Sequence, residues 1–188
     1  MKIDRLLFPV TALGPGNRLV LWTKGCSRHC KNCANPELWD SKNAKEYSPE
    51  NIFNIIKNID EKTPIDGVTI SGGEPFEQID DLLILLEMLK TITDDIIVFT
   101  GYTFEELKRN FSSEEVEEIQ ELISVLIDGE YKHELNDNES SLRGSTNQNI
   151  IFFDESKKEK YSEYLKRGRT IQNVYMGKKL ISVGIHNK

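Results

Sequence analysis

Residues 26–33 read Cys26-Ser27-Arg28-His29-Cys30-Lys31-Asn32-Cys33, and they hold every cysteine of the 188-residue chain. Three cysteines cannot all pair as disulfides, and the tight spacing C-x3-C-x2-C indicates a metal or cluster site. A structural zinc ion takes four protein ligands. A four-iron cluster bound by three cysteines instead keeps one iron without a protein ligand, which leaves a position open for chemistry. The spacing therefore favours an iron–sulfur cluster.

A structural zinc site is the alternative for this loop. His29 could complete a Cys3His ligand set, but it directly precedes Cys30, and that adjacency strains a shared tetrahedron. The other two histidines, His133 and His186, lie far away in the sequence. The alternative stays open. It belongs to a wider non-enzymatic reading, in which the loop binds structural zinc or holds an iron–sulfur cluster that only carries electrons.

The segments around the loop predict alternating strands and helices. Strands are expected where β-branched, aromatic and other apolar residues run together, at 6–10, 18–23, 68–71, 96–100, 124–127 and 149–153. Helices are expected from Ser48-Pro49, over 79–92, after the capping boxes that begin at Thr103 and Ser112, and over 155–167. The tail predicts a β-hairpin made of 170–176, a Gly177-Lys178 turn and 180–185.

This alternation predicts an α/β fold with a mostly parallel sheet. Polar loops follow four of the strands: the cysteines, 72–75, 100–102 and Asp128-Gly129. The carboxyl ends of parallel strands share one edge of a sheet, where ligands bind. We therefore expect the four loops to surround one mouth. The strands are too few for a closed eight-unit barrel.

Composition narrows the functional classes. The net charge of −7 argues against a nucleic-acid partner and against binding to an anionic membrane surface. No run approaches the ~20 apolar residues of a membrane span, and the N-terminus lacks the features of a signal peptide. Unpaired thiols without an export signal predict a reducing cytoplasm. The length predicts one domain, 1–188.

The loop Gly25–Cys33 and the following Ala34-Asn35-Pro36-Glu37-Leu38-Trp39 resemble the radical S-adenosylmethionine (SAM) enzymes. The resemblance is greatest to their small glycyl-radical-activating branch, the activating proteins of anaerobic ribonucleoside-triphosphate reductase. It extends from about Gly14 to the final hairpin and includes motifs at 72–75, 100–102 and 143–148. It implies an open partial (β/α) barrel of the radical SAM type, with a core at about 14–153 and an added helix and hairpin at 155–186.

The resemblance implies two cofactors. Cys26, Cys30 and Cys33 would hold a [4Fe–4S] cluster, and SAM would chelate its open iron through the amino and carboxylate groups. An electron from the cluster would then cleave the sulfonium C–S bond, which gives methionine and a 5′-deoxyadenosyl radical. Many relatives carry an aromatic residue at the position of Asn32, so only a backbone contact to adenine is implied here. Ala34 is placed with Asn32 in the cofactor site.

Further cofactor residues follow from the other motifs. The resemblance assigns Ser71, Gly72, Gly73 and Glu74 to SAM, with Glu74 and its flanking backbone binding the amino group of the methionine moiety. Taken alone, such a turn is more often a plain connection from strand to helix.

Three residues from later loops complete the assignment. Thr100, Asp128 and Arg143 are expected in the same site, where an arginine could bind the SAM carboxylate or ribose, or the backbone of a partner protein. The alternative is a loop held by an ion pair between Asp128 and Arg143.

The function implied by the resemblance is that of a radical SAM oxidoreductase, a glycyl-radical-activating enzyme. The expected protein substrate is the large subunit of anaerobic ribonucleoside-triphosphate reductase, with a flavodoxin- or ferredoxin-type reductant. Small size fits this expectation, because an open mouth suits a glycine presented on the loop of another protein. The enzymatic alternative is a radical SAM enzyme acting on a small molecule or a peptide.

Overall fold

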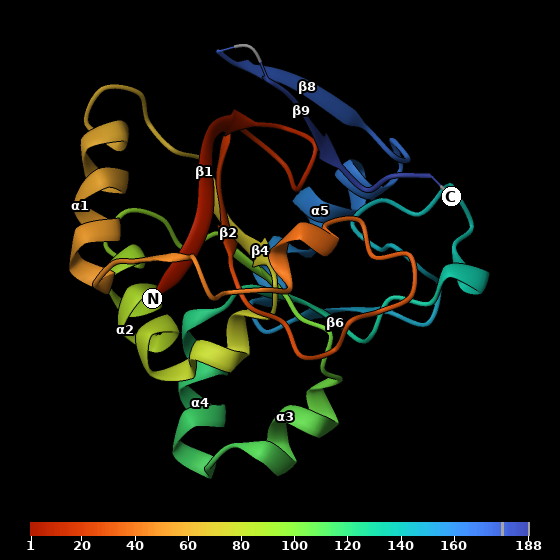
Figure 1. The fold of residues 1–188 in the computed structure, drawn as a ribbon, viewed down its shortest axis with the longest axis horizontal. Coiled ribbons are helices and arrows are strands. Elements are labelled where there is room, and N and C mark those ends of the chain that lie inside the picture. The colour runs from red at the N-terminus through yellow and green to blue at the C-terminus, as the bar shows by residue number, and fades with distance from the viewer. Residues whose placement is uncertain (178, 188) are drawn as a thin grey trace.

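The computed structural model describes residues 1–177 and 179–187. One sheet runs through the middle of these residues, with the strand order β3-β1-β2-β4-β5-β6-β7 (Figure 1). Its strands are β1 (Lys2–Val10), β2 (Arg18–Thr23), β3 (Lys45–Glu46), β4 (Gly67–Gly72), β5 (Ile96–Phe99), β6 (Val125–Asp128) and β7 (Asn149–Phe152). Every strand predicted from the sequence is present.

The centre of the sheet is parallel. Strands β2, β4, β5 and β6 run in one direction, with Ile70 of β4 opposite Leu21 on one side and Val98 on the other. These strands are mainly apolar and buried, as is typical of parallel sheets covered on both faces. Strands β1, β3 and β7 are antiparallel to their neighbours. The mostly parallel sheet is thus confirmed, with antiparallel strands at its edges.

Five α-helices and four short 3-10 helices lie among the described residues. They are α1 (Pro49–Asp60), α2 (Ile79–Leu89), α3 (Phe104–Asn110), α4 (Ser113–Leu122) and α5 (Lys158–Leu165), together with the short 3-10 helices η1 (Pro36–Leu38), η2 (Pro75–Gln78), η3 (His133–Leu135) and η4 (Glu155–Lys157). Ser48 caps α1, and both predicted capping boxes form, at Thr103 and Ser112. Within the described ranges, no helix has the length and apolarity that crossing a membrane requires.

The two faces of the sheet are covered differently. Helices α1, α2 and α4 bury one face through a large apolar core that includes Leu21, Ile56 and Leu86. Helix α5 and a separate hairpin, β8 (Ile171–Met176) with β9 (Lys179–Gly184), cover the other face (Figure 1). The predicted hairpin is confirmed, although Lys178 of its predicted turn lies outside the described residues.

A buried ionic network holds the edge where the parallel strands begin. The fully buried Arg18 donates to the Asp95 carboxylate at 3.0 Å and to the Thr69 hydroxyl at 2.7 Å. Lys160 Nζ lies 2.6 Å from the same carboxylate, which also accepts from the Tyr161 hydroxyl. Burial opposes ionisation of Asp95, but Arg18, Lys160 and Tyr161 outweigh it and lower the pKa of this carboxyl. This edge of the sheet is therefore built for stability, opposite the edge that carries the predicted site.

Candidate functional site

A cavity of about 370 Å³ lies at the carboxyl ends of the parallel strands. Its wall includes all three cysteines after β2, residues 71–74 at the end of β4, 99–101 at the end of β5, and Gly129 after β6. The predicted meeting of four loops at one mouth is confirmed. The volume is within the range of small-molecule sites.

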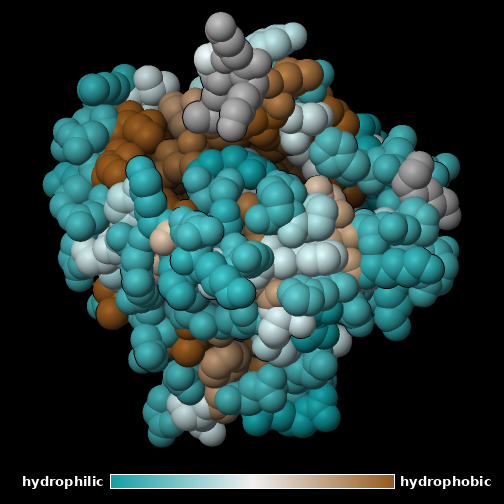
Figure 2. Space-filling model, viewed as in Figure 1, coloured by the Kyte–Doolittle hydropathy of each residue, from teal (hydrophilic) through white to brown (hydrophobic). Residues whose placement is uncertain are grey.

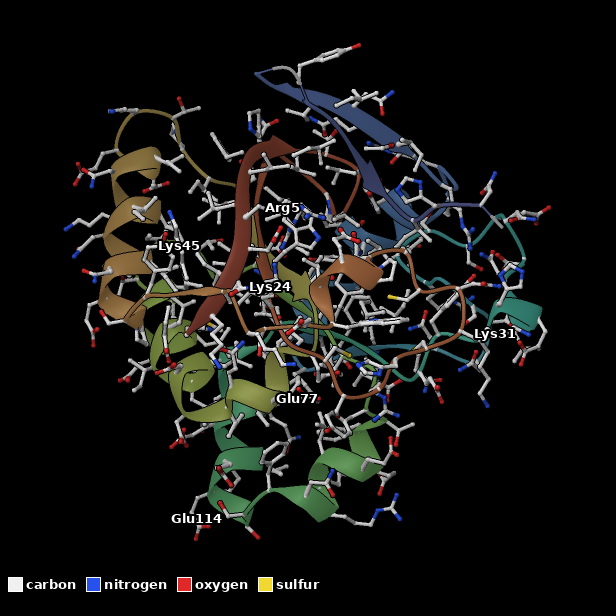
Figure 3. All side chains as sticks on the ribbon, viewed as in Figure 1. Arg5, Lys24, Lys31, Lys45, Glu77 and Glu114 are labelled. Carbon is white, nitrogen blue, oxygen red and sulfur yellow. The ribbon has the colours of Figure 1, made fainter. Side chains whose placement is uncertain are left out.

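The cysteine loop is fixed at its base. Gly25 N–H donates to the Leu38 carbonyl at 2.8 Å, which closes the segment that carries the thiols. The backbone and the hydroxyl of Ser27 both donate to Glu77 Oε1, at 2.8 and 2.6 Å. Figure 3 shows Glu77 below the loop and Lys31 at its outer edge. The loop is therefore tied to the neighbouring 3-10 helix η2 while its tip faces solvent.

Two residues within the loop adopt left-handed backbone conformations. His29 has φ +46° and Asn32 has φ +58°, values that few residues other than glycine adopt and that asparagine tolerates best. Cys33 N–H donates to the Cys30 carbonyl at 3.1 Å, which closes the turn that contains Asn32. The chain thus turns twice within eight residues, and all three partly buried thiols, Cys26 included, line the same cavity.

The thiols lie in an environment that fits an iron–sulfur cluster. Asn35 N–H donates to Cys33 Sγ at 3.4 Å, and backbone N–H groups also donate to the sulfurs of Cys26 and Cys30. Hydrogen bonds to sulfur are among the features by which proteins tune bound clusters. Burial raises the pKa of the Cys26 and Cys30 thiols, but a coordinating metal deprotonates a thiol outright. These three residues therefore fit a cluster with one iron left open.

The zinc alternative fits this geometry less well. His29 is exposed, its ring centroid lies 4.7 Å from that of Trp39, and it does not line the cavity. In the part of the chain that the structure describes, no three His, Cys, Asp or Glu side chains are grouped to hold one metal ion. A four-iron cluster has its irons at separate corners, so its thiolates need not meet at a single atom.

The Gly-Gly-Glu turn packs against the backbone of the cysteine loop. A Cβ on Gly73 would lie 2.1 Å from the Gly25 carbonyl oxygen, and one on Gly72, whose φ is +118°, would lie 2.3 Å from Thr23 N. With glycine at both positions the two loops come close enough for backbone hydrogen bonds. Gly73 N–H donates to the Thr23 carbonyl at 2.9 Å, and Glu74 N–H donates to the Gly25 carbonyl at 2.8 Å. The glycines are thus required by close contact between two loops of the site.

Glu74 lines the cavity and joins two strand ends. Its Oε1 accepts from the Thr100 hydroxyl at 2.8 Å and from Phe76 N–H at 3.1 Å, and its Oε2 accepts from Gly101 N–H at 2.7 Å. The side chain is buried, and burial raises the pKa of Glu74 to about 7 despite these hydrogen bonds. A carboxylate has about four acceptor positions, so one remains on Oε2 for a ligand.

The structure brings most of the predicted residues together. Those that line the cavity are Cys26, Cys30, Asn32, Cys33, Ala34, Ser71, Gly72, Gly73, Glu74 and Thr100. Asp128 and Arg143 are not among them. Asp128 is buried and accepts from Phe104 N–H at 2.8 Å and from the Asn149 side chain at 2.8 Å.

Arg143 has local partners. Its guanidinium donates to the Gln148 carbonyl at 3.3 Å and to the Ser140 hydroxyl at 3.2 Å. No ion pair links Asp128 with Arg143 among the residues described here. A role of these two residues at a cofactor stays a prediction.

Several cavity residues were not predicted. Arg28 lines the cavity. Its guanidinium carbon lies 4.6 Å from the Tyr102 ring centroid, and its Nη2 lies 3.9 Å from Glu106 Oε2. Its position in the sequence, between Cys26 and Cys30, could have indicated that it lies in the site. Tyr131 and His133 come from the 130–148 loop. Residues 182–187 of the tail also line the cavity, and no local pattern in the sequence indicates this placement.

Comparisons with known proteins agree with this geometry. A family model described as a 4Fe-4S single cluster domain matches residues 12–151. The chain is 31% identical over 147 residues to the anaerobic ribonucleoside-triphosphate reductase-activating protein of Salmonella typhimurium, which covers 75% of this chain and 92% of that protein. The protein of the same name from Enterobacteria phage T4 is 30% identical over 155 residues, 80% of this chain and 93% of the relative.

A shorter similarity reaches a second kind of activating enzyme. The pyruvate formate-lyase-activating enzyme of Listeria monocytogenes is 34% identical over 82 residues, which cover 43% of this chain and 33% of that enzyme.

Proposed function

Since the chain belongs to the radical SAM family, in the branch of the anaerobic ribonucleoside-triphosphate reductase-activating proteins, we propose that it generates a glycyl radical on a partner enzyme. The partner is anaerobic ribonucleoside-triphosphate reductase, which the names of these relatives give as the enzyme that they activate. One observation carries the proposal. Three thiols spaced C-x3-C-x2-C line one cavity together with the Gly-Gly-Glu turn at the carboxyl edge of a parallel sheet.

The chain supplies the binding groups for both cofactors. Cys26, Cys30 and Cys33 would hold the [4Fe–4S] cluster, and other residues that line the same cavity would bind SAM. When bound, the cluster supplies one electron to the sulfonium of SAM, which yields methionine and a 5′-deoxyadenosyl radical. The free acceptor position of Glu74 receives the ammonium of the methionine moiety, and Thr100 holds that carboxylate in place.

The remaining cavity residues orient SAM and limit its contact with water. Ser71, Gly72 and Gly73 would bind SAM through their backbone, and the backbone at Asn32 and Ala34 would contact its adenine. The four loops that form the cavity wall would limit the access of water to the reacting groups, which protects a reactive intermediate.

We infer that the sheet is the open partial (β/α) barrel of this family, in one domain with its core at about 14–153 and an added helix and hairpin at 155–186. The parallel order β2-β4-β5-β6 and the family match over residues 12–151 support this assignment.

A flavodoxin- or ferredoxin-type protein would supply the electron. The three thiols must stay unpaired to bind iron, so the protein works in a reducing compartment, the cytoplasm.

Electron paramagnetic resonance tests the proposal. The protein is reconstituted with iron and sulfide without oxygen, reduced with dithionite, and mixed with SAM and the reductase. The expected result is a glycyl-radical doublet that requires both SAM and the protein. If SAM is cleaved and no doublet forms, the assignment of the partner is wrong, although the SAM chemistry stands. If about one zinc per chain and no iron is bound, the chemistry itself is wrong.

A further inference from the structure

The C-terminal hairpin lies outside the family match yet lines the cavity. The match ends at residue 151, whereas β8 and β9 cover 171–184. Residues 182–187 form one wall of the cavity that the three cysteines also line. An element that this chain has outside the family match therefore borders the mouth of the site.

The inner face of the hairpin is fixed to the main sheet. Val183 is buried in the same apolar cluster as Leu7 and Trp22. Gln172, directly opposite Val183, accepts from Thr11 N–H at 2.9 Å and donates to the Pro9 carbonyl at 2.9 Å. These contacts hold the start of β8 and the end of β9 in place.

Arg169 fixes the other end of this wall. Its side chain is 5% exposed, and its guanidinium donates to the carbonyls of His186 at 2.9 Å, Ser140 at 3.1 Å and Arg143 at 3.1 Å. The tail is thereby attached to the loop around Gly144, which also lines the cavity. The hairpin is thus a firmly attached wall of the site.

The outer face of the hairpin is exposed and carries three large apolar side chains among small polar ones. Strand pairing places Tyr175 opposite Leu180, Asn173 opposite Ser182 and Ile171 opposite Gly184, so these residues share one face. Tyr175 is 76% exposed, Leu180 54% and Ile171 46%. Figure 2 shows hydrophobic surface at the top of the molecule, where the hairpin projects in Figure 1. Tyr175 and Leu180 are opposite each other across the two strands, and most of each side chain is exposed.

One end of this outer face borders the cavity. Ser182 and Gly184 belong to it by strand pairing, and both also line the cavity. Exposed apolar side chains that lie together and are rimmed by polar residues can mark an interaction site. A protein segment that enters the cavity along this wall would lie beside the outer face.

We propose that the outer face of the hairpin, formed by Ile171, Asn173, Tyr175, Leu180 and Ser182, is the docking surface for the glycyl-radical enzyme. The inference rests on the proposed function. The partner would present an apolar patch beside the loop that carries its reactive glycine. Tyrosine is enriched at the centre of protein interfaces and among the residues that dominate their binding energy, so Tyr175 is the expected anchor of this surface.

Two other occupants fit less well. A second copy of this chain on the same face would lie across Ser182 and Gly184 and cover the entrance to the cavity. A protein reductant would approach the cluster most directly at the cysteine loop, where His29 and Lys31 are exposed. The docking surface therefore serves the protein substrate.

Charge substitutions in the whole, reconstituted protein test the proposal. Tyr175→Glu and Leu180→Glu introduce a charge at exposed positions, and Ile55→Glu, on α1 across the sheet and 47% exposed, is the matched control. With dithionite as reductant, 5′-deoxyadenosine formation without partner should be unchanged in all three variants. The Kd for the reductase should rise about tenfold or more for the two hairpin variants, as expected when one interface anchor is lost. The glycyl-radical yield of these two variants should be lower than that of wild type at a limiting concentration of reductase, and it should recover when the reductase concentration is high.

Each other outcome overturns the proposal. Wild-type radical yield with an unchanged Kd in both hairpin variants means that docking occurs elsewhere, while the proposed function stands. Loss of a dimer in Tyr175→Glu, seen by sedimentation, means that the face joins two copies of this chain. If wild-type protein forms no glycyl radical on the reductase, the proposed partner fails and the docking surface fails with it. Tyr175→Ser and Leu180→Ser give the same readouts if the glutamate variants do not fold.

Discussion

At the scale of single residues, Glu74 connects the structure of the site to its chemistry. Its carboxylate is buried, accepts three hydrogen bonds, and joins the end of β4 to the end of β5. Burial raises the pKa of Glu74 to about 7. A bound ammonium would favour the charged form again, so the site is suited to a cationic group.

The raised pKa predicts a pH dependence of stability. The folded protein keeps the Glu74 proton up to about pH 7, whereas the unfolded chain loses it near 4.5. Unfolding therefore becomes easier as the pH rises through this window, by about 3 kcal/mol. Glu74→Gln has no such proton to lose. In urea unfolding of the apoprotein, the free energy of unfolding of the variant, relative to that of wild type, should rise by about 3 kcal/mol from pH 4.5 to pH 7.5. If the free energies of unfolding of wild type and variant change with pH in the same way, the pKa of Glu74 is not raised by folding.

A substitution at Gly73 should weaken the contact between the two loops of the site. In Gly73→Ala the new Cβ would meet the Gly25 carbonyl oxygen at 2.1 Å, so the turn must move away from the cysteine loop. We expect several-fold less iron per chain after reconstitution and a lower melting temperature, as for other steric clashes with backbone. Ser27→Ala is the control, because it removes one hydroxyl bond to Glu77 and keeps the backbone bond. Full iron content in Gly73→Ala would mean that the close contact is not needed.

At the scale of elements, the strands and helices were predictable because their signals are local. The apolar run of β2 and the capping boxes at Thr103 and Ser112 depend only on neighbouring residues. The order of strands at the edges was less predictable. Strand β7 is connected to β6 by a loop and not by a crossover helix. Because parallel neighbours need a crossover connection, β7 pairs with β6 in the antiparallel direction.

The buried network at the start of the strands predicts a large effect of one isosteric change. Asp95→Asn removes the negative charge that faces the fully buried Arg18 and the nearby Lys160. Leaving a buried charge without its partner costs about 3–5 kcal/mol. The control is Glu155→Gln, which breaks an exposed ion pair with Lys158 and should cost about 1 kcal/mol or less. Urea unfolding measures both values, and equal small losses would contradict a stabilising role for the network.

At the scale of the whole molecule, most of the site was predictable because parallel strands bring distant loops to one edge. Ten of the predicted residues line the cavity for this reason. Asp128 follows the same rule in sequence, but its side chain bonds to Phe104 and Asn149. The tail that completes the wall could not be predicted, because its position depends on tertiary contacts such as those of Arg169 and Val183.

The central claim is that Cys26, Cys30 and Cys33 hold a cluster whose open iron binds SAM. Quantification of 5′-deoxyadenosine after anaerobic reconstitution and reduction with dithionite tests it most directly. We expect wild-type protein with about four irons per chain to form 5′-deoxyadenosine from SAM, and Cys30→Ala to form none above the protein-free background. No product from iron-loaded wild type, or equal product from Cys30→Ala, would contradict the account.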